Sequence, residues 1–182
     1  MPSDLPINAV LPSLINAFRE NDDVILEAEP GAGKTTVVPL ALLNSGWLEE
    51  NIILMLEPRR VAARAAAERM AATLGEAVGE TIGYQVRHEK KYSSKTKVLV
   101  VTEGILARKL QADPSLEGIG LVIFDEFHER NLDSDLALAF CLQSRDYFRE
   151  TTPLKLLVMS ATLDSLALTK CCLLYTSDAA DD

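Results

Sequence analysis

The sequence predicts an α/β protein with a doubly wound, mainly parallel sheet and helices on both faces. Short, fully apolar runs of strand length alternate along the chain with longer helical segments, as they do when each parallel crossover carries a helix. Polar motifs directly follow most of these runs, and ligands of parallel sheets bind at the carboxyl ends of strands. The 182 residues, 48% of them apolar, suffice for one domain with its own core.

The individual elements follow from the spacing of apolar residues. Within residues 1–20 the apolar positions recur at helical spacing and predict an amphipathic helix packed on the domain, to which we assign no chemistry. Strands are predicted at 24–26, 52–56, 81–86, 98–102, 121–124 and 154–159, with a long alanine-rich helix at about 61–74. The basic segment 87–97 is expected to be a loop, either an accessory basic patch or a solvated hairpin.

Residues 29–36 have the composition of a phosphate-binding loop. They lie between the first apolar run and the apolar stretch 37–43, so a strand, a glycine-rich turn and a helix start follow one another. Glycines in this turn let backbone N–H groups and the positive end of the helix dipole face an anion. The residues predicted to bind a nucleotide here are Gly31, Ala32, Gly33, Lys34, Thr35 and Thr36.

Two side chains of this loop have predicted roles in binding a nucleoside triphosphate with Mg²⁺. Lys34, expected at the protein surface, would contact the β- and γ-phosphates, and the Thr35 hydroxyl would bind Mg²⁺. The general pattern G-x-x-x-x-G-K-[ST] has its first glycine where this chain has Ala28. A plain glycine-rich turn is the alternative, and the strand-to-helix context argues against it.

A second motif begins at Asp125, directly after the apolar run 121–124 and 91 positions after Lys34. Asp125 is predicted to hold Mg²⁺, in part through water, because Mg²⁺ retains part of its hydration shell. Glu126 is predicted to accept a proton from an attacking water. Together with Lys34, these carboxylates indicate catalysis of nucleoside triphosphate hydrolysis. Considered alone, the motif would also fit a strand end followed by a solvated acidic helix cap.

Three polar residues are assigned a role in coupling. His128 follows the two carboxylates, and a single histidine in that position is more often a structural hydrogen-bonding group than a catalyst. Ser160 and Thr162 follow the last predicted strand, where they would hydrogen-bond the segment 125–128 and report the presence of the γ-phosphate. From spacing alone, Ser-Ala-Thr is a weak signal.

Charge and composition argue against several classes of protein. The formal charge of −9 argues against bulk electrostatic binding of nucleic acid, so any such contact would be local. Of the three cysteines, Cys141 stands alone and Cys171 and Cys172 are adjacent, which fits neither a zinc cluster nor a mutual disulfide. No basic residue precedes Arg19, and no apolar run approaches the roughly 18 residues of a membrane span, so we expect a cytoplasmic protein.

Together these motifs resemble the first RecA-like domain of superfamily-two helicases of the DEAH type, a P-loop NTPase fold. The resemblance covers residues 5–167, and motif II reads DEFH rather than DEAH. Phe127 and the runs 56–64 and 101–104 are similar to the bacterial HrpB-type ATP-dependent helicases. In chain order the motifs are Gly31 to Thr36 (I), Pro58-Arg59-Arg60 (Ia), Thr102-Glu103-Gly104 (Ib), Asp125 to His128 (II) and Ser160-Ala161-Thr162 (III).

The resemblance implies partners and further contact residues. Arg59, Arg60 and Thr102 would contact the phosphate backbone of single-stranded RNA, with DNA as the weaker candidate, and Arg69 would stack on the adenine of ATP. Arginine binds phosphate bidentately, and backbone contacts carry little sequence information. For the two adjacent arginines the alternative is a solvated helix N-terminus, although cations there oppose the helix dipole.

The segment 172–182 resembles the in-frame translation of a sequencing adapter and is expected to be disordered. Removing its three aspartates changes the formal charge from −9 to −6, so the acidic balance remains. The helicase domain is therefore taken as residues 1–171. The resemblance also implies a second RecA-like domain, absent from this chain, that supplies an arginine finger and closes on the nucleotide.

Two classes of function remain open for the chain. It is either the N-terminal motor domain of an ATP-dependent RNA helicase, or a binding module that holds nucleotide weakly without hydrolysing it. A different P-loop ATPase is a third alternative, which the ordered strand-end motifs oppose. Because a missing arginine finger typically costs about 10³ to 10⁵ in kcat, we expect barely detectable hydrolysis by these 182 residues.

Overall fold

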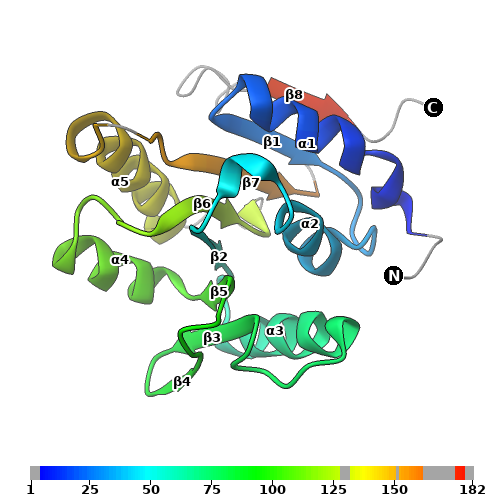
Figure 1. Cartoon of the computed structure of the whole chain (residues 1–182), viewed down its shortest axis with the longest axis horizontal. Helices are drawn as coiled ribbons and strands as arrows, with labels where there is room; N and C mark the ends of the chain where they lie inside the picture. Colours follow the sequence, from blue (N-terminus) through cyan, green and yellow to red (C-terminus); the bar gives the residue numbers. More distant parts are fainter. Residues whose placement is uncertain (1–4, 128–131, 151, 162–174, 179–182) are drawn as a thin grey trace.

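The computed structural model describes residues 5–127, 132–150, 152–161 and 175–178, and within these ranges eight strands form one sheet (Figure 1). Their spatial order is β4-β3-β5-β2-β6-β7-β1-β8. The strands are β1 (Asp23–Glu27), β2 (Ile52–Leu56), β3 (Ile82–Val86), β4 (Glu89–Lys91), β5 (Val98–Val101), β6 (Ile119–Phe124), β7 (Lys155–Ser160) and β8 (Tyr175–Asp178). The helices are η1 (Pro6–Ala9), α1 (Leu11–Glu20), α2 (Lys34–Leu42), η2 (Gly46–Leu48), α3 (Arg60–Leu74), α4 (Glu103–Ala112) and α5 (Leu132–Phe148).

Neighbouring strands in the described sheet run parallel, except for the hairpin formed by β3 and β4. This arrangement confirms the predicted α/β fold with a mainly parallel sheet. The segment 87–97 was expected to be a loop, with a solvated hairpin as one alternative, and its strand β4 agrees with that alternative, since Glu89 pairs with Val86 and Lys91 with Tyr84. All three residues of β4 are exposed and charged, so the strand lacks the apolar pattern by which the others were predicted.

Two apolar cores lie on opposite faces of the sheet. Helices α1, α2 and α3 pack on one face and α4 and α5 on the other, as the two separate clusters of buried residues show. Alternation along β2 illustrates the division, since Met55 faces the first cluster and Leu54 and Leu56 face the second. No helix within the described ranges is both long and apolar enough to cross a membrane.

The carboxyl ends of the central strands meet at one edge of the sheet, where backbone hydrogen bonds join the segments that follow them. The N–H of Asp125, after β6, donates to Leu56 O of β2 at 3.1 Å. The N–H of Ala28, after β1, donates to Ser160 O of β7 at 3.1 Å. These bonds bring the predicted phosphate loop and the second acidic motif to the same edge of the fold.

Strand β8 lies at the edge of the sheet beside β1 and pairs with it in parallel, Val24 opposite Tyr175 and Glu27 opposite Asp178 (Figure 1). These four residues differ from the disorder expected for the segment 172–182. The strand has a physical reason, because the outer edge of β1 offers unpaired N–H and C=O groups to any extended segment nearby. The remainder of that segment, residues 172–174 and 179–182, lies outside the described ranges, and its origin in an adapter stays a prediction.

Candidate functional site

The loop between β1 and α2 has the backbone geometry that the glycines predict. Gly31 and Gly33 adopt φ values of 82° and 98°, in the left-handed region that side-chain-bearing residues rarely occupy. Gly33 is the N-cap of α2, and its carbonyl accepts the N–H of Val37 at 2.9 Å. The loop therefore turns sharply into the helix N-terminus, where first-turn N–H groups and the helix dipole favour an anion.

The N-terminal segment packs directly against this loop, a contact that the sequence analysis did not foresee. The N–H of Ile7, in η1, donates to Ala32 O at 3.4 Å. A Cβ added at Gly33 would approach Leu5 Cδ1 to 2.9 Å and Ile7 Cγ2 to 3.3 Å. Two features therefore favour glycine at position 33, the positive φ and the close packing of Leu5 and Ile7.

Lys34 is buried, with only 4% of its surface exposed, so the expectation of a surface lysine is wrong. Its ammonium group donates hydrogen bonds to the carbonyl oxygens of Ala28 and, at 3.0 Å, of Glu29. The charge is thus held by carbonyls of the loop to which it belongs. Burial of this lysine is tolerated in part because two of its three N–H donors are paired with carbonyls.

The two residues predicted to bind Mg²⁺ lie in direct contact. The Thr35 hydroxyl at the start of α2 donates a hydrogen bond of 2.6 Å to Asp125 Oδ2, which follows β6. Asp125 is buried, and its second oxygen, Oδ1, accepts the N–H of Glu126 at 2.9 Å. Residues 90 positions apart in the sequence therefore present two oxygens at one point, and oxygen ligands are those that Mg²⁺ prefers.

Glu57, at the end of β2, is a buried member of this site to which the sequence analysis gave no role. The pKa of its carboxyl is raised from 4.5 to about 9, mainly by burial and then by the negative charge of Asp125, a hydrogen bond with Asp125 and the charge of Glu126, whereas the charge of Arg69 lowers it. Glu57 is therefore the protonated partner of Asp125 at neutral pH. A carboxylate directly after an apolar strand was the available signal, but its proximity to Asp125 depends on β2 pairing with β6.

The backbone turns at Glu126, which separates two neighbouring side chains. Glu126 has a φ of 51°, in the left-handed region that is uncommon for residues other than glycine. Phe127 is buried in the core beneath α4 and α5, with its ring edge-on to Phe124 at a centroid distance of 6.0 Å. Anchoring by Phe127 therefore holds a strained turn beside Asp125, while Glu126 itself remains partly exposed.

The residues that the resemblance associates with nucleic acid lie at the same edge of the sheet, on neighbouring strands. Arg59 and Arg60 are exposed and follow β2, where they form the N-cap and first residue of α3. Thr102, half-buried, follows the adjacent strand β5 and is the N-cap of α4. Arg69, exposed on α3, is near enough for its charge to lower the pKa of Glu57.

The predicted coupling residues are described only in part. Ser160 is buried at the end of β7, and its carbonyl accepts the N–H of Ala28 at the start of the phosphate loop. Strand β7 lies between β6 and β1, so Ser160 stands between the two motifs that it was predicted to couple. His128 and Thr162 lie outside the described residues.

Known proteins resemble this chain in both sequence and structure. The ATP-dependent RNA helicase HrpB of Escherichia coli is 51% identical over 163 residues, which cover 90% of this chain and 20% of that protein. The mouse ATP-dependent RNA helicase DHX33 is 36% identical over 162 residues, covering 88% of this chain and 23% of that protein. A crystal structure of the E. coli DEAH/RHA helicase HrpB superposes with a TM-score of 0.90 at 46% identity, over 96% of this chain and 22% of that one.

The chain thus spans about a fifth of the length of the relatives that it matches. The DEAD/DEAH box helicase family matches residues 9–169, which include most of the described residues and all of the motifs predicted from the sequence. This match, the identity to HrpB and the agreement of the two structures bear out the resemblance to HrpB-type helicases and the RecA-like fold. The chain belongs to the DEAD/DEAH box helicase family.

Proposed function

We propose that this chain is the N-terminal motor domain of an HrpB-like, DEAH-type ATP-dependent RNA helicase, which binds Mg-ATP and single-stranded RNA. In a longer parent protein, hydrolysis would be coupled to strand unwinding. The observation that carries the proposal is the 2.6 Å hydrogen bond from Thr35 to Asp125, which joins the phosphate loop to the acidic motif. A plain glycine-rich turn does not require a buried carboxylate from a distant strand.

The residues present fit Mg²⁺ and the phosphates of ATP. Thr35 and Asp125 would hold the ion, since their oxygens converge and Mg²⁺ is commonly bound by one or two protein oxygens with phosphates and water. Bound Mg²⁺ would neutralise charge on the phosphates. Backbone N–H groups within Gly31 to Thr36 would face the phosphates, and those of Ala32 and Thr36 would first have to leave Glu29 O and Gly33 O, to which they donate at 3.2 and 3.3 Å. Phosphate oxygens would replace Ala28 O and Glu29 O as acceptors for Lys34.

Glu126 is the group that we assign to proton transfer. It is partly exposed beside Asp125, and a general base must be able to reach the water that it activates. Asp125 is less suited to this role, because Thr35 and the N–H of Glu126 already occupy its oxygens. Arg69 would stack on the adenine, and Ser160 with His128 and Thr162 would couple the nucleotide to the rest of the motor.

The RNA-binding residues in this proposal are Arg59, Arg60 and Thr102. Their exposed or half-buried positions on neighbouring strand ends support a track along one edge of the sheet. Few phosphate contacts are available against the net negative charge, so affinity should be weak and its salt dependence shallow. A second RecA-like domain of the parent would complete the track, and a cytoplasmic location stays a prediction.

A second candidate function is nucleotide binding without hydrolysis by this chain alone. It is favoured by the coverage of only about a fifth of the relatives' length. Phosphate release with and without poly-uridine RNA distinguishes the two. We expect barely detectable turnover that RNA does not raise, whereas RNA-stimulated turnover at ordinary enzyme rates would show that these 182 residues suffice.

The proposal is tested by titrating the chain with a fluorescent ATP analogue in Mg²⁺ and displacing the analogue with ATP. Lys34→Ala should weaken binding by about 100-fold or more, because its ammonium group is a charge-assisted donor to phosphate. Lys97→Ala is the matched control, since that lysine pairs with Glu50 on the surface at 3.0 Å.

Thermal unfolding of each variant shows whether it is folded, which matters because Lys34 is buried. If Lys34→Ala were folded and bound ATP like the Lys97 variant, the assignment of the phosphate loop would be wrong. Thr35→Ala offers a second, less disruptive probe of the same loop.

A further inference from the structure

Helix α5 carries apolar side chains on two sides. Ala137, Leu138 and Cys141 face the core. On another side of the helix Leu132, Leu136, Phe140 and Tyr147 are exposed, and at 3.6 residues per turn they lie within about a quarter of the helix circumference. A helix that merely covers a sheet exposes polar residues there, so this second apolar stripe is not explained by the fold.

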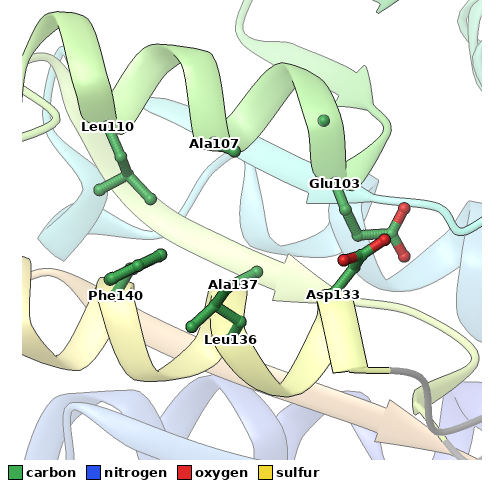
Figure 2. A pocket seen from close by; sticks show the side chains of 8 residues that line it. Glu103, Ala107, Leu110, Asp133, Leu136, Ala137 and Phe140 are labelled. Carbon is green, nitrogen blue, oxygen red and sulfur yellow. The ribbon is translucent and has the colours of Figure 1, made fainter.

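The stripe borders a groove between α4 and α5. One half is lined by Ala107 and Leu110 of α4 and by Leu136, Ala137 and Phe140 of α5, and Figure 2 shows these side chains facing one another across it. A second hollow shares Ala107, Leu110 and Phe140 and continues along the helices to Pro114 and Phe148. The two hollows therefore form one elongated, largely apolar groove.

The groove has an acidic end. Glu103 begins α4 and Asp133 lies in the first turn of α5, and their carboxylates gather at the same end of the groove (Figure 2). At the other end, Gln111, Gln143 and Ser144 line the hollow, together with apolar residues and without a charged side chain. Because both helices start at the acidic end, they run in the same direction.

We propose that this α4–α5 groove binds an amphipathic helix of a protein partner, whose apolar face covers Leu136 and Phe140 and whose last turn carries basic residues opposite Glu103 and Asp133. Charge decides the orientation. A helix that runs antiparallel to α4 and α5 brings its negative carbonyl end to their positive N-termini, and its terminal lysines or arginines to the two carboxylates. Since α4 has 10 residues, an occupant of about three to four turns fills the groove.

Other occupants fit less well. A second copy of this chain would bring another protein of charge −9 to an acidic rim. RNA would place phosphates beside Glu103 and Asp133 and against apolar side chains, whereas phosphate contacts call for cations. The groove is also separate from the nucleotide site, because neither Lys34 nor Asp125 lines it.

The probe is an alanine-based helical peptide of about four turns, with leucines at i, i+3, i+4 and i+7, lysines in its last turn and a fluorescent label. Its affinity for the chain is measured by fluorescence anisotropy. A matched peptide carries glutamates in place of the lysines. We expect the basic peptide to bind at least about tenfold more tightly than the acidic one.

Leu136→Asp should weaken binding of the basic peptide at least about tenfold, because a charge replaces the apolar centre of the groove. Leu74→Asp on α3 is the matched control, since the two leucines are 47% and 38% exposed and Leu74 lies on the helix layer of the other face. Asp133→Lys should reverse the preference between the two peptides. Affinity of the chain for the ATP analogue should be unchanged in all three variants.

Several outcomes would overturn the proposal. These are failure of the basic peptide to bind, equal affinities for the two peptides, and equal effects of Leu136→Asp and Leu74→Asp. Sedimentation that showed self-association abolished by Leu136→Asp would assign the groove to a second copy. Loss of single-stranded RNA binding in the same variant would assign it to RNA.

Discussion

The Thr35–Asp125 centre and the exposed arginines after β2 lie at the same edge of the sheet but differ in how their charges are held. Asp125 and Lys34 are buried and hydrogen-bonded within the fold. Arg59 and Arg60 are exposed at a helix start. Side chains that take part in catalysis act best when the fold already holds them in position. Side chains that bind the backbone of a polymer must instead be exposed to reach it. Substitutions in the buried centre should therefore have large effects on ATP turnover and stability. Substitutions of the exposed arginines should have small effects on RNA affinity.

The largest effect is expected for Glu126→Gln in the full-length parent protein that we propose. Steady-state phosphate release should fall by about 10² to 10⁴, because an amide can position water but cannot accept its proton. Affinity for the fluorescent ATP analogue should stay within about twofold, because no contact of Glu126 with phosphate is proposed.

Glu117→Gln is the control for that experiment, since Glu117 is exposed in the turn before β6. Near-normal turnover by the Glu126 variant would remove this residue as the general base. Burial near Asp125 would then not mark the residues on which hydrolysis depends.

Gly33→Ala should have the next largest effect. The substitution puts a Cβ 2.9 Å from Leu5 Cδ1 at a residue with φ of 98°, so the free energy of unfolding should fall by about 1–3 kcal/mol. ATP affinity should fall with it, because the loop cannot keep its turn. Gly46→Ala, where a Cβ meets nothing within 4 Å, is the control. Equal losses in the two variants, measured by urea unfolding, would contradict this account of the loop.

The strands of the fold were largely predictable, whereas part of the site was not. Residues 52–56 were predicted as a strand and form β2 with the same bounds, because a parallel strand buried on both faces is apolar throughout. Strand β4 was not predicted as a strand because its three residues are charged and exposed and only pairing with β3 defines it, although a solvated hairpin was one of the two alternatives for residues 87–97.

Residues of the site were predictable where the motif itself carries the chemistry. Thr35 and Asp125 were given a shared role from their motifs and lie in contact, while the role itself stays a prediction. The burial of Lys34 was not predictable, because the carbonyls that hold its ammonium group are backbone atoms whose direction depends on the folded loop. Glu57 was missed for a related reason, since its hydrogen bond to Asp125 arises from the pairing of two strands.

Arg59→Ala and Arg60→Ala should each weaken binding of single-stranded RNA several-fold. If each residue contacts one phosphate, the slope of log affinity against log salt should become shallower by about 0.7 per residue lost. The measurement is anisotropy of labelled poly-uridine at several salt concentrations, with the exposed Arg108→Ala as control. An unchanged slope would remove the two arginines from the RNA track, and reduced ATP affinity would contradict the separation of the two regions.

A separate prediction, on stability rather than on binding, concerns the proton on the buried Glu57. Its pKa is raised from the ordinary 4.5 to about 9, so between these values the folded protein holds a proton that the unfolded chain releases. In Mg²⁺-free solution, this group should therefore make stability fall as pH rises from about 4.5 to 9. Glu57→Gln, which keeps a neutral donor beside Asp125, should flatten that dependence in urea unfolding. If the stability of the Glu57→Gln variant and of the unsubstituted protein fell equally with pH, Glu57 would not be the group that holds the proton.

The central claim is that Thr35 and Asp125 hold one Mg²⁺ with the nucleotide, and a double-mutant cycle on ATP affinity tests it most directly. Thr35→Ala, Asp125→Asn and the double variant are titrated with the fluorescent ATP analogue, once with Mg²⁺ and once with EDTA. We predict a coupling energy of about 0.5–3 kcal/mol in Mg²⁺ that disappears in EDTA, since both residues would serve the same ion. Additive losses in Mg²⁺, or the same coupling in EDTA, would contradict the account.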